Sequence, residues 1–205
     1  MTKAALGFRA HSGWATLVAV AGPLRSPTVI DRRRLELVDP GAPECKQPYH
    51  AAEDLPLARA ATLVNRCTEA ARRLARQGVS GAVDDIRRGG HELVGCGLIL
   101  GSGRPLTSLA SMLASHALIH TAEGELFRDV LARASAACDL AVRGIKEKEL
   151  EAKAAAELGC PQDELRRRLG EMGRSLGPPW RQDEKLATLV AWLILSARLE
   201  TTMRA

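Results

Sequence analysis

The first forty residues constrain the fold of this chain more than any other stretch. Three apolar or alternating segments, residues 3–10, 14–21 and 28–38, follow one another with short connections between them. His11, Ser12 and Gly13 separate the first two, and small, φ-permissive residues of this kind are typical of a hairpin turn. We therefore expect a three-stranded antiparallel meander at the front of a mixed sheet.

The remainder of the chain alternates helical and strand patterns, which predicts an α/β fold. A stripe of apolar residues at helical spacing follows Pro56, and Gly78 is the expected stop of that helix. We expect a single domain over residues 1–205, with a helical C-terminal part from about residue 146. The further expected elements are a short helix over 82–88, a strand over 91–100, a helical region over 105–138, a strand over 139–145, and helices over 146–158, 160–176 and 183–197.

Composition limits the classes of function. The 205 residues are 46% hydrophobic and 26% charged, as in one sizeable globular domain. Lys plus Arg exceed Asp plus Glu by 29 − 24 = 5, which permits anionic partners. Aromatic residues make up only 3%, so base stacking on single strands is disfavoured. The fuller dinucleotide and P-loop signatures are absent, and we expect no cofactor.

The cysteines and the longest apolar run indicate the cellular compartment in which we expect the protein. Five cysteines are scattered without a C-x-x-C pair, which predicts neither a disulfide nor a zinc-finger framework and favours the cytoplasm. The longest apolar helical run, around residues 186–197, is shorter than the roughly twenty residues of a membrane span. No charged-then-apolar leader opens the chain, and we expect no membrane contact.

The loop after the predicted strand 91–100 is a candidate anion site. Gly101, Ser102, Gly103 and Arg104 follow the strand directly, and small residues at this position can present backbone N–H groups to an anion. A plain strand-to-helix turn explains the same residues.

Two histidines and a carboxylate lie at helical spacing in the region 105–138. His116, His120 and Glu123 are separated by four and three residues, so they share one stripe of a continuous helix. Three interpretations compete: histidines that hydrogen-bond at a helix edge, a polar anion pocket completed by Arg9, His11 and Arg104, or a metal site. The metal interpretation lacks an H-E-x-x-H base, and Gly124 could end the helix after Glu123.

The order of elements resembles that of the RNase H-like folds, and within them the RuvC-type Holliday-junction resolvases. Three local patterns carry the resemblance. Residues 6–14 (LGFRAHSGW) resemble the first-strand pattern of apolar-Gly-apolar-Asp and the return strand. Residues 142–146 (VRGIK) resemble the exit of the fifth strand, and residues 183–191 (DEKLATLVA) resemble the acidic start of the last helix. The resemblance is one of fold.

The resemblance also implies which acids should be present. Members of this family hydrolyse phosphodiesters with two divalent ions, held by carboxylates from the first strand and from the end of the fourth. This chain has Arg9 at the first position and Ile99-Leu100-Gly101 at the second, which leaves Asp183 and Glu184. A cation in place of a carboxylate repels the metal, so the resemblance implies the scaffold without two-metal nuclease chemistry.

Three functions remain open at this stage. In the first, the chain binds an anionic small molecule, a nucleotide or a nucleic-acid backbone through Arg9, His11, Ser12 and the loop 101–104. In the second, it is a hydrolase or nuclease of other chemistry, in which His116, His120 and Glu123 act as acid and base or, with Asp183 and Glu184, hold a metal. In the third, it is a scaffold that forms a homodimer through Trp180 and the Pro178-Pro179 region, or through the last helix. The first two require these groups to converge on one pocket.

Overall fold

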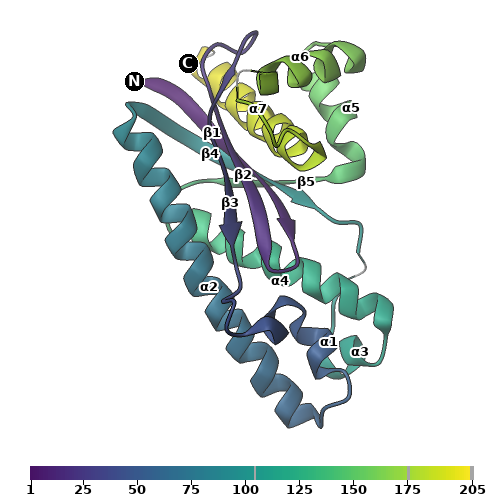
Figure 1. Ribbon diagram of the computed structural model, residues 1–205. Helices are drawn as coiled ribbons and strands as arrows, with labels where there is room; N and C mark the ends of the chain where they lie inside the picture. Colours follow the sequence, from purple (N-terminus) through teal and green to yellow (C-terminus); the bar gives the residue numbers. More distant parts are fainter. Residues whose placement is uncertain (104, 175, 204–205) are drawn as a thin grey trace.

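A five-stranded sheet lies between two helical layers (Figure 1). The computed structural model describes residues 1–103, 105–174 and 176–203, the last six by their backbone alone. Helices α2 (Leu57–Arg88) and α4 (His116–Ala136) cover one face of the sheet. Helix α7 (Gln182–Met203) covers the other face, and α5 (Glu147–Glu157) and α6 (Gln162–Arg174) pack on α7. No helix among the described residues has the length and apolarity needed to cross a bilayer.

The sheet confirms the predicted α/β fold with an antiparallel meander and two further strands. Its strands are β1 (Thr2–His11), β2 (Trp14–Ala21), β3 (Thr28–Glu36), β4 (His91–Leu100) and β5 (Val142–Lys146). Their order is β3-β2-β1-β4-β5. Neighbours within β1–β3 are antiparallel, whereas β4 is parallel to both β1 and β5. The fifth strand starts at Val142, three residues later than expected, since Asp139 has a φ of 62° and the chain turns there.

Glycines on β1 and β4 let α7 lie directly on the sheet. A Cβ at Gly7 would be 1.9 Å from the carbonyl oxygen of Ala187, and one at Gly97 would be 2.5 Å from a methyl carbon of Val190. Alternation along β1 places Leu6 on the opposite face, in the core formed with α2 and α4. The two faces of β1 therefore pack differently: one contacts α2 and α4, and the other contacts α7.

Helix α2 is one helix, where the sequence predicts a stop at Gly78 and a second helix over 82–88. Its buried stripe continues through Ala75, Val79 and Ala82 on both sides of the glycine. A Cβ at Gly78 would be 3.1 Å from the side chain of Leu35, so the glycine serves close packing on β3. Burial of the stripe outweighs the roughly 1 kcal/mol that an interior glycine costs.

A small helical lobe extends from the end of the sheet (Figure 1). It consists of the 3₁₀ turn η1 (Pro43–Lys46), α1 (Pro48–Ala52), the first half of α2, α3 (Leu109–Leu113) and the start of α4. A core of Ala52, Ala60 and Val64 holds it together. The region 105–138 is thus two helices, and α4 continues through Gly124, where a break was predicted.

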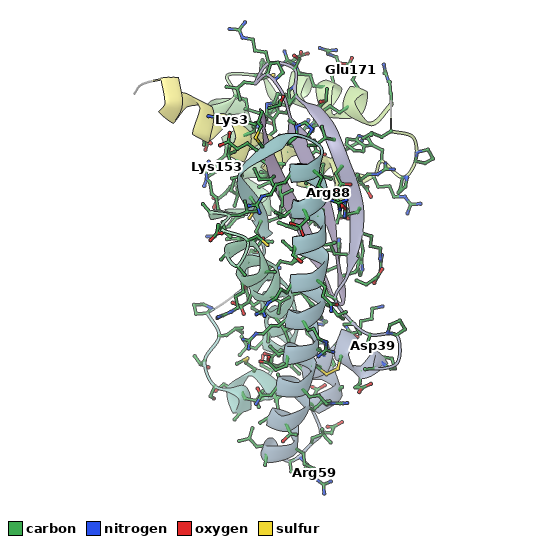
Figure 2. All side chains as sticks on the ribbon, turned by 90° about the vertical axis from the view of Figure 1, so that its left-hand side faces the viewer. Lys3, Asp39, Arg59, Arg88, Lys153 and Glu171 are labelled. Atoms are coloured by element: carbon green, nitrogen blue, oxygen red, sulfur yellow. A yellow bond between two sulfur atoms is a disulfide. The ribbon has the colours of Figure 1, made fainter. Side chains whose placement is uncertain are left out.

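A disulfide joins Cys45 of η1 to Cys67 of α2, and the prediction that this chain has no disulfide is wrong. The two Cα atoms are 5.0 Å apart, within the range that a disulfide bridges. Figure 2 shows the bond against α2 in the lobe, on the same side as the labelled Asp39. A separation of 22 residues matches no short cysteine motif, so only the packing of η1 on α2 reveals the pair. The inference from unpaired cysteines to a reducing compartment loses its basis.

The close contact at Gly7 predicts the effect of one added methyl group. We expect Gly7→Ala to lower the free energy of unfolding by about 3 kcal/mol, because the new Cβ meets a backbone atom that cannot rotate away. Urea denaturation measures the change. The matched control is Gly170→Ala on α6, where the added Cβ meets no atom within 4 Å and helix propensity adds up to about 1 kcal/mol. Equal effects of the two substitutions would contradict the packing of α7 on β1.

The disulfide predicts a redox-dependent stability. Denatured protein without reductant should show three reactive thiols out of five, those of Cys96, Cys138 and Cys160. Reduction should lower the free energy of unfolding by about 3 kcal/mol, as expected for opening a loop of this length. The Cys45→Ser/Cys67→Ser variant is the control, since its stability should not respond to reductant. Five reactive thiols in the oxidised protein would disprove the bond.

Candidate functional site

The C-terminal ends of the parallel strands and the first turns of two helices meet at one edge of the sheet. Arg9 lies near the end of β1, and Glu147 opens α5 directly after β5. Asp183 lies in the first turn of α7, one turn before Ala187. Because Ala187 contacts Gly7 and strand residues alternate, Asp183 is placed over Arg9, two residues beyond Gly7 on the same face. Crevices of α/β sheets that bind ligands lie at this edge.

Arg9 is the centre of an ion-pair cluster. Its Nε donates to Oδ1 of Asp183 at 2.7 Å, and its Nη1 donates to Oε2 of Glu147 at 2.6 Å. Nε2 of His11 lies 3.1 Å from the second carboxylate oxygen of Asp183. The guanidinium therefore ties β1 to α5 and α7. Such charge-assisted bonds are stronger and more directional than neutral ones.

This cluster does not fit the divalent ions that the family resemblance implies. Hard cations need several negatively charged oxygens that point at one place. Here the oxygens of Asp183 and Glu147 point at the guanidinium of Arg9, which already supplies the positive charge. The donor set is that of a salt-bridge cluster and not that of a two-metal centre.

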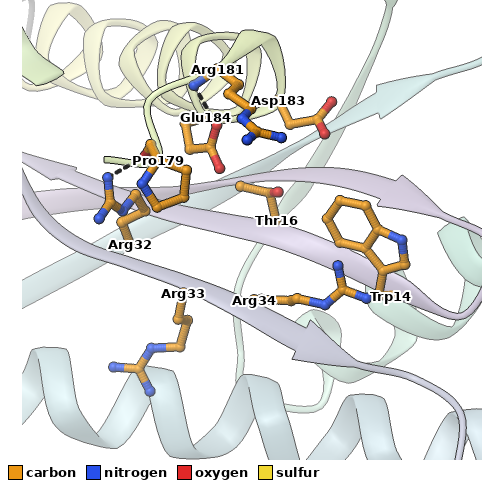
Figure 3. A pocket seen from close by; sticks show the side chains of 9 residues that line it. All are labelled: Trp14, Thr16, Arg32, Arg33, Arg34, Pro179, Arg181, Asp183 and Glu184. Carbon is orange, nitrogen blue, oxygen red and sulfur yellow. Dashed lines mark hydrogen bonds between the residues drawn. The ribbon is translucent and has the colours of Figure 1, made fainter. Parts of the chain in front are cut away.

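A pocket of about 400 Å³ opens beside the cluster, between β2, β3 and the start of α7 (Figure 3). The ring of Trp14 stacks on His11 with centroids 4.2 Å apart, and the guanidinium carbon of Arg34 lies 3.9 Å from the Trp14 ring centroid. Nη1 of Arg32 donates to the carbonyl oxygens of Gly177, at 3.0 Å, and of Pro179. The lining residues are Trp14, Thr16, Arg32, Arg33, Arg34, Pro179, Arg181, Asp183 and Glu184.

A second pocket, of about 370 Å³, lies next to Glu147. Gly101 and Ser102 of the predicted anion loop line it together with Lys146 and Lys148. Gly103 faces elsewhere, toward Thr121 of α4, and Arg104 lies outside the described residues. The structure therefore places part of the loop beside two cations of β5 and α5.

The helical lobe contains a cluster of three histidines. His116 and His120 are exposed on the first turns of α4, with their Nε2 atoms 3.0 Å apart, and His50 of α1 packs edge-on against both rings. One nitrogen from each ring lies within 4.8 Å of the others. His50 was missed by the sequence analysis, because it lies 66 residues before His116 and only the packing of α1 on α4 brings it near.

Glu123 is buried under this cluster. Its Oε1 accepts hydrogen bonds from the backbone N–H groups of Tyr49, at 2.9 Å, and His50, at 3.2 Å, and it lies 3.3 Å from Nδ1 of His50. Burial raises the pKa of the Glu123 carboxyl, and the hydrogen bonds from His50 and Tyr49 oppose that rise. Glu123 therefore holds α1 against α4.

The predicted site residues thus fall into two clusters that share no residue. Arg9 and His11 meet Asp183, whereas His116 and His120 meet His50 beside Glu123. The contacts therefore do not bring Arg9 and the histidines together in the single pocket that one interpretation of the sequence predicted. The other predicted residues are placed separately: Ser12 lies in the β1–β2 turn, the carboxylate of Glu184 accepts from the backbone N–H of Arg181, and Trp180 donates to the carbonyl of Leu169 in its own chain.

The strand order, the parallel β4 and β5, and the helix laid over β1 and β4 define an RNase H-like fold of the RuvC type. Two solved structures of RuvC from Thermus thermophilus share it. One, described as a complex with a Holliday junction substrate, matches with a TM-score of 0.50 at 10% identity, over 97% of each chain. The other matches with a TM-score of 0.51 at 11% identity, also over 97% of each chain. At this identity the likeness is one of fold. No family model and no curated protein matches the sequence.

The ion-pair cluster predicts how magnesium affects stability. The melting temperature of the wild type should not change with millimolar Mg²⁺, because Asp183 and Glu147 each already bond the Arg9 guanidinium through one oxygen. Arg9→Asp should melt lower without metal, since three carboxylates then repel one another, and Mg²⁺ should restore much of the loss. Differential scanning calorimetry measures both shifts.

The matched control for this charge reversal is Arg143→Asp, which breaks a pair with Glu157 at the other end of α5 from Glu147. Mg²⁺ should not stabilise that variant. A magnesium-dependent rise in the wild type as large as that in Arg9→Asp would show that the cluster holds a metal as it stands.

Proposed function

We propose that this chain is a RuvC-type module that binds the phosphate backbone of branched duplex DNA and does not cleave it by two-metal chemistry. The observation that carries the proposal is the guanidinium of Arg9 between Asp183 and Glu147. Cleavage by a two-metal centre needs those carboxylate oxygens free to bind the ions, whereas binding of DNA does not. The fold can therefore still bind duplex DNA although a salt-bridge cluster occupies the position of the catalytic centre.

Positively charged side chains flank the centre on both sides. Toward β3, Arg32 hydrogen-bonds neutral carbonyls, so no acid among the described residues pairs with it, and the exposed Arg181 lines the same pocket. Toward β5, the exposed Lys146 and Lys148 line the pocket with Ser102. The carboxylates offset the charge of Arg9 itself, so phosphates would bind on the flanks. Backbone contacts of this kind dominate affinity for nucleic acids.

The choice of branched DNA rests on the likeness of fold. The Thermus thermophilus protein with the same strand order is described in complex with a Holliday junction substrate. The low aromatic content of this chain, 3%, also disfavours single strands relative to duplex DNA. A four-way junction is therefore the first probe, and a linear duplex of the same sequence is its comparison.

We expect the full chain to bind a labelled four-way junction in a fluorescence-anisotropy titration, with an affinity that falls steeply as salt rises. Lys146→Ala/Lys148→Ala and Arg32→Ala/Arg181→Ala should each weaken binding. For every phosphate that a variant no longer neutralises, the slope of log affinity against log salt should become shallower by about 0.9.

The control is Arg73→Ala/Arg76→Ala, which removes the same charge from the exposed side of α2. It should leave the affinity and the slope nearly unchanged. Incubation of the junction with Mg²⁺ or Mn²⁺ should yield no cleavage product. Cleavage that disappears in Asp183→Asn, or junction binding that is weakened equally in the control, would overturn the proposal.

A further inference from the structure

The histidine cluster in the helical lobe lies apart from the Arg9 centre, and the proposed function makes no use of it. We propose that His50, His116 and His120 form a binding site for a transition-metal ion of the Zn²⁺ class, with Glu123 as the carboxylate that positions His50. This site would clamp α1 to α4. The inference is independent of DNA binding.

The geometry is close to that of a three-histidine site. Two ligands of a tetrahedral zinc ion, each about 2.0–2.1 Å from the metal, are separated by about 3.3 Å. The Nε2 atoms of His116 and His120 are 3.0 Å apart, and one ring nitrogen from each of the three histidines lies within 4.8 Å of the other two. The exposed rings of His116 and His120 can rotate by the small amount that closes the triangle. Their spacing of four residues places both on one face of α4.

Glu123 provides a second and independent indication of a ligand. Histidines that bind metals commonly donate their other ring N–H to a carboxylate, which fixes the tautomer and the ring orientation. Oε1 of Glu123 lies 3.3 Å from Nδ1 of His50, so the tautomer that carries its proton on Nδ1 would leave Nε2 of that ring to bind the metal. The Glu123 side chain is only 3% exposed, and its Oε2 is buried with no hydrogen-bond partner among the described residues. A bound cation would offset this buried negative charge.

The donor atoms select the class of metal. Three imidazole nitrogens suit Zn²⁺, Cu²⁺, Ni²⁺ and Co²⁺, whereas Mg²⁺ and Ca²⁺ require oxygen ligands. The fourth position would face solvent, because His116 and His120 are exposed. The site would be a second link within the lobe. The Cys45–Cys67 disulfide joins η1 to α2, and the metal would join α1 to α4.

Zinc titration of the full chain tests the site. The protein is prepared without a histidine tag, stripped with a chelator and titrated with Zn²⁺ by calorimetry, with native mass spectrometry as the count of bound ions. We expect one Zn²⁺ per chain, a higher melting temperature on binding, and no response to Mg²⁺. Co²⁺ should bind competitively and give visible absorption bands of a four-coordinate ion.

Four variants separate the proposal from adventitious binding. His116→Ala and His120→Ala, both at exposed positions, should abolish saturable binding without lowering the melting temperature of the metal-free protein. Glu123→Gln should keep one Zn²⁺ per chain but weaken its affinity by about tenfold to a hundredfold. His91→Ala, at the start of β4, is the control and should bind like the wild type. Unchanged zinc affinity in His116→Ala, or equal loss in His91→Ala, would overturn the site.

Discussion

The direct contact of α7 with β1 and β4 is the constraint on which the rest of the structure depends. A side chain at Gly7 or Gly97 would force the helix away from the sheet. With glycine at both positions, the backbone of α7 rests on the strands, and its first turn reaches the C-terminal edge of β1. Asp183 can then meet Arg9 there. The close approach of α7 to β1 therefore determines both the packing and the ion pairing at this edge.

The position of Arg9 determines what chemistry that edge can support. The family resemblance implies carboxylates around hard cations at this edge, whereas here a guanidinium joins Asp183 to Glu147. The side chains of Arg9 and Asp183 are 20% and 28% exposed, so the bond between them is partly screened and contributes little to the stability of the fold. The positive charge that can meet a polyanion lies on either side of it.

The helical lobe has its own set of links, because its core is small. Its hydrophobic cluster consists of Ala52, Ala60 and Val64, and the further buried side chains of its elements include Cys45, Cys67 and Ile119. A core of this size contributes little burial energy, and small units commonly depend on disulfides or metals for stability. The Cys45–Cys67 bond links η1 to α2 in this lobe, and the hydrogen bonds of Glu123 and the proposed metal at His50 link α1 to α4.

Local patterns in the sequence determined the meander, the strand 91–100, the last helix and, through element order, the RNase H-like fold, because alternation and turn residues act over a few positions. The family resemblance also implied that Arg9 stands at the position of an acid. Only the tertiary structure decided the Cys45–Cys67 bond, the passage of α2 through Gly78, the meeting of Arg9 with Glu147, and the place of His50 beside His116. Each of these features joins residues far apart in the chain or depends on packing against another element. A local periodic pattern contains no information on such contacts, so their stabilising energy arises only when the elements pack together.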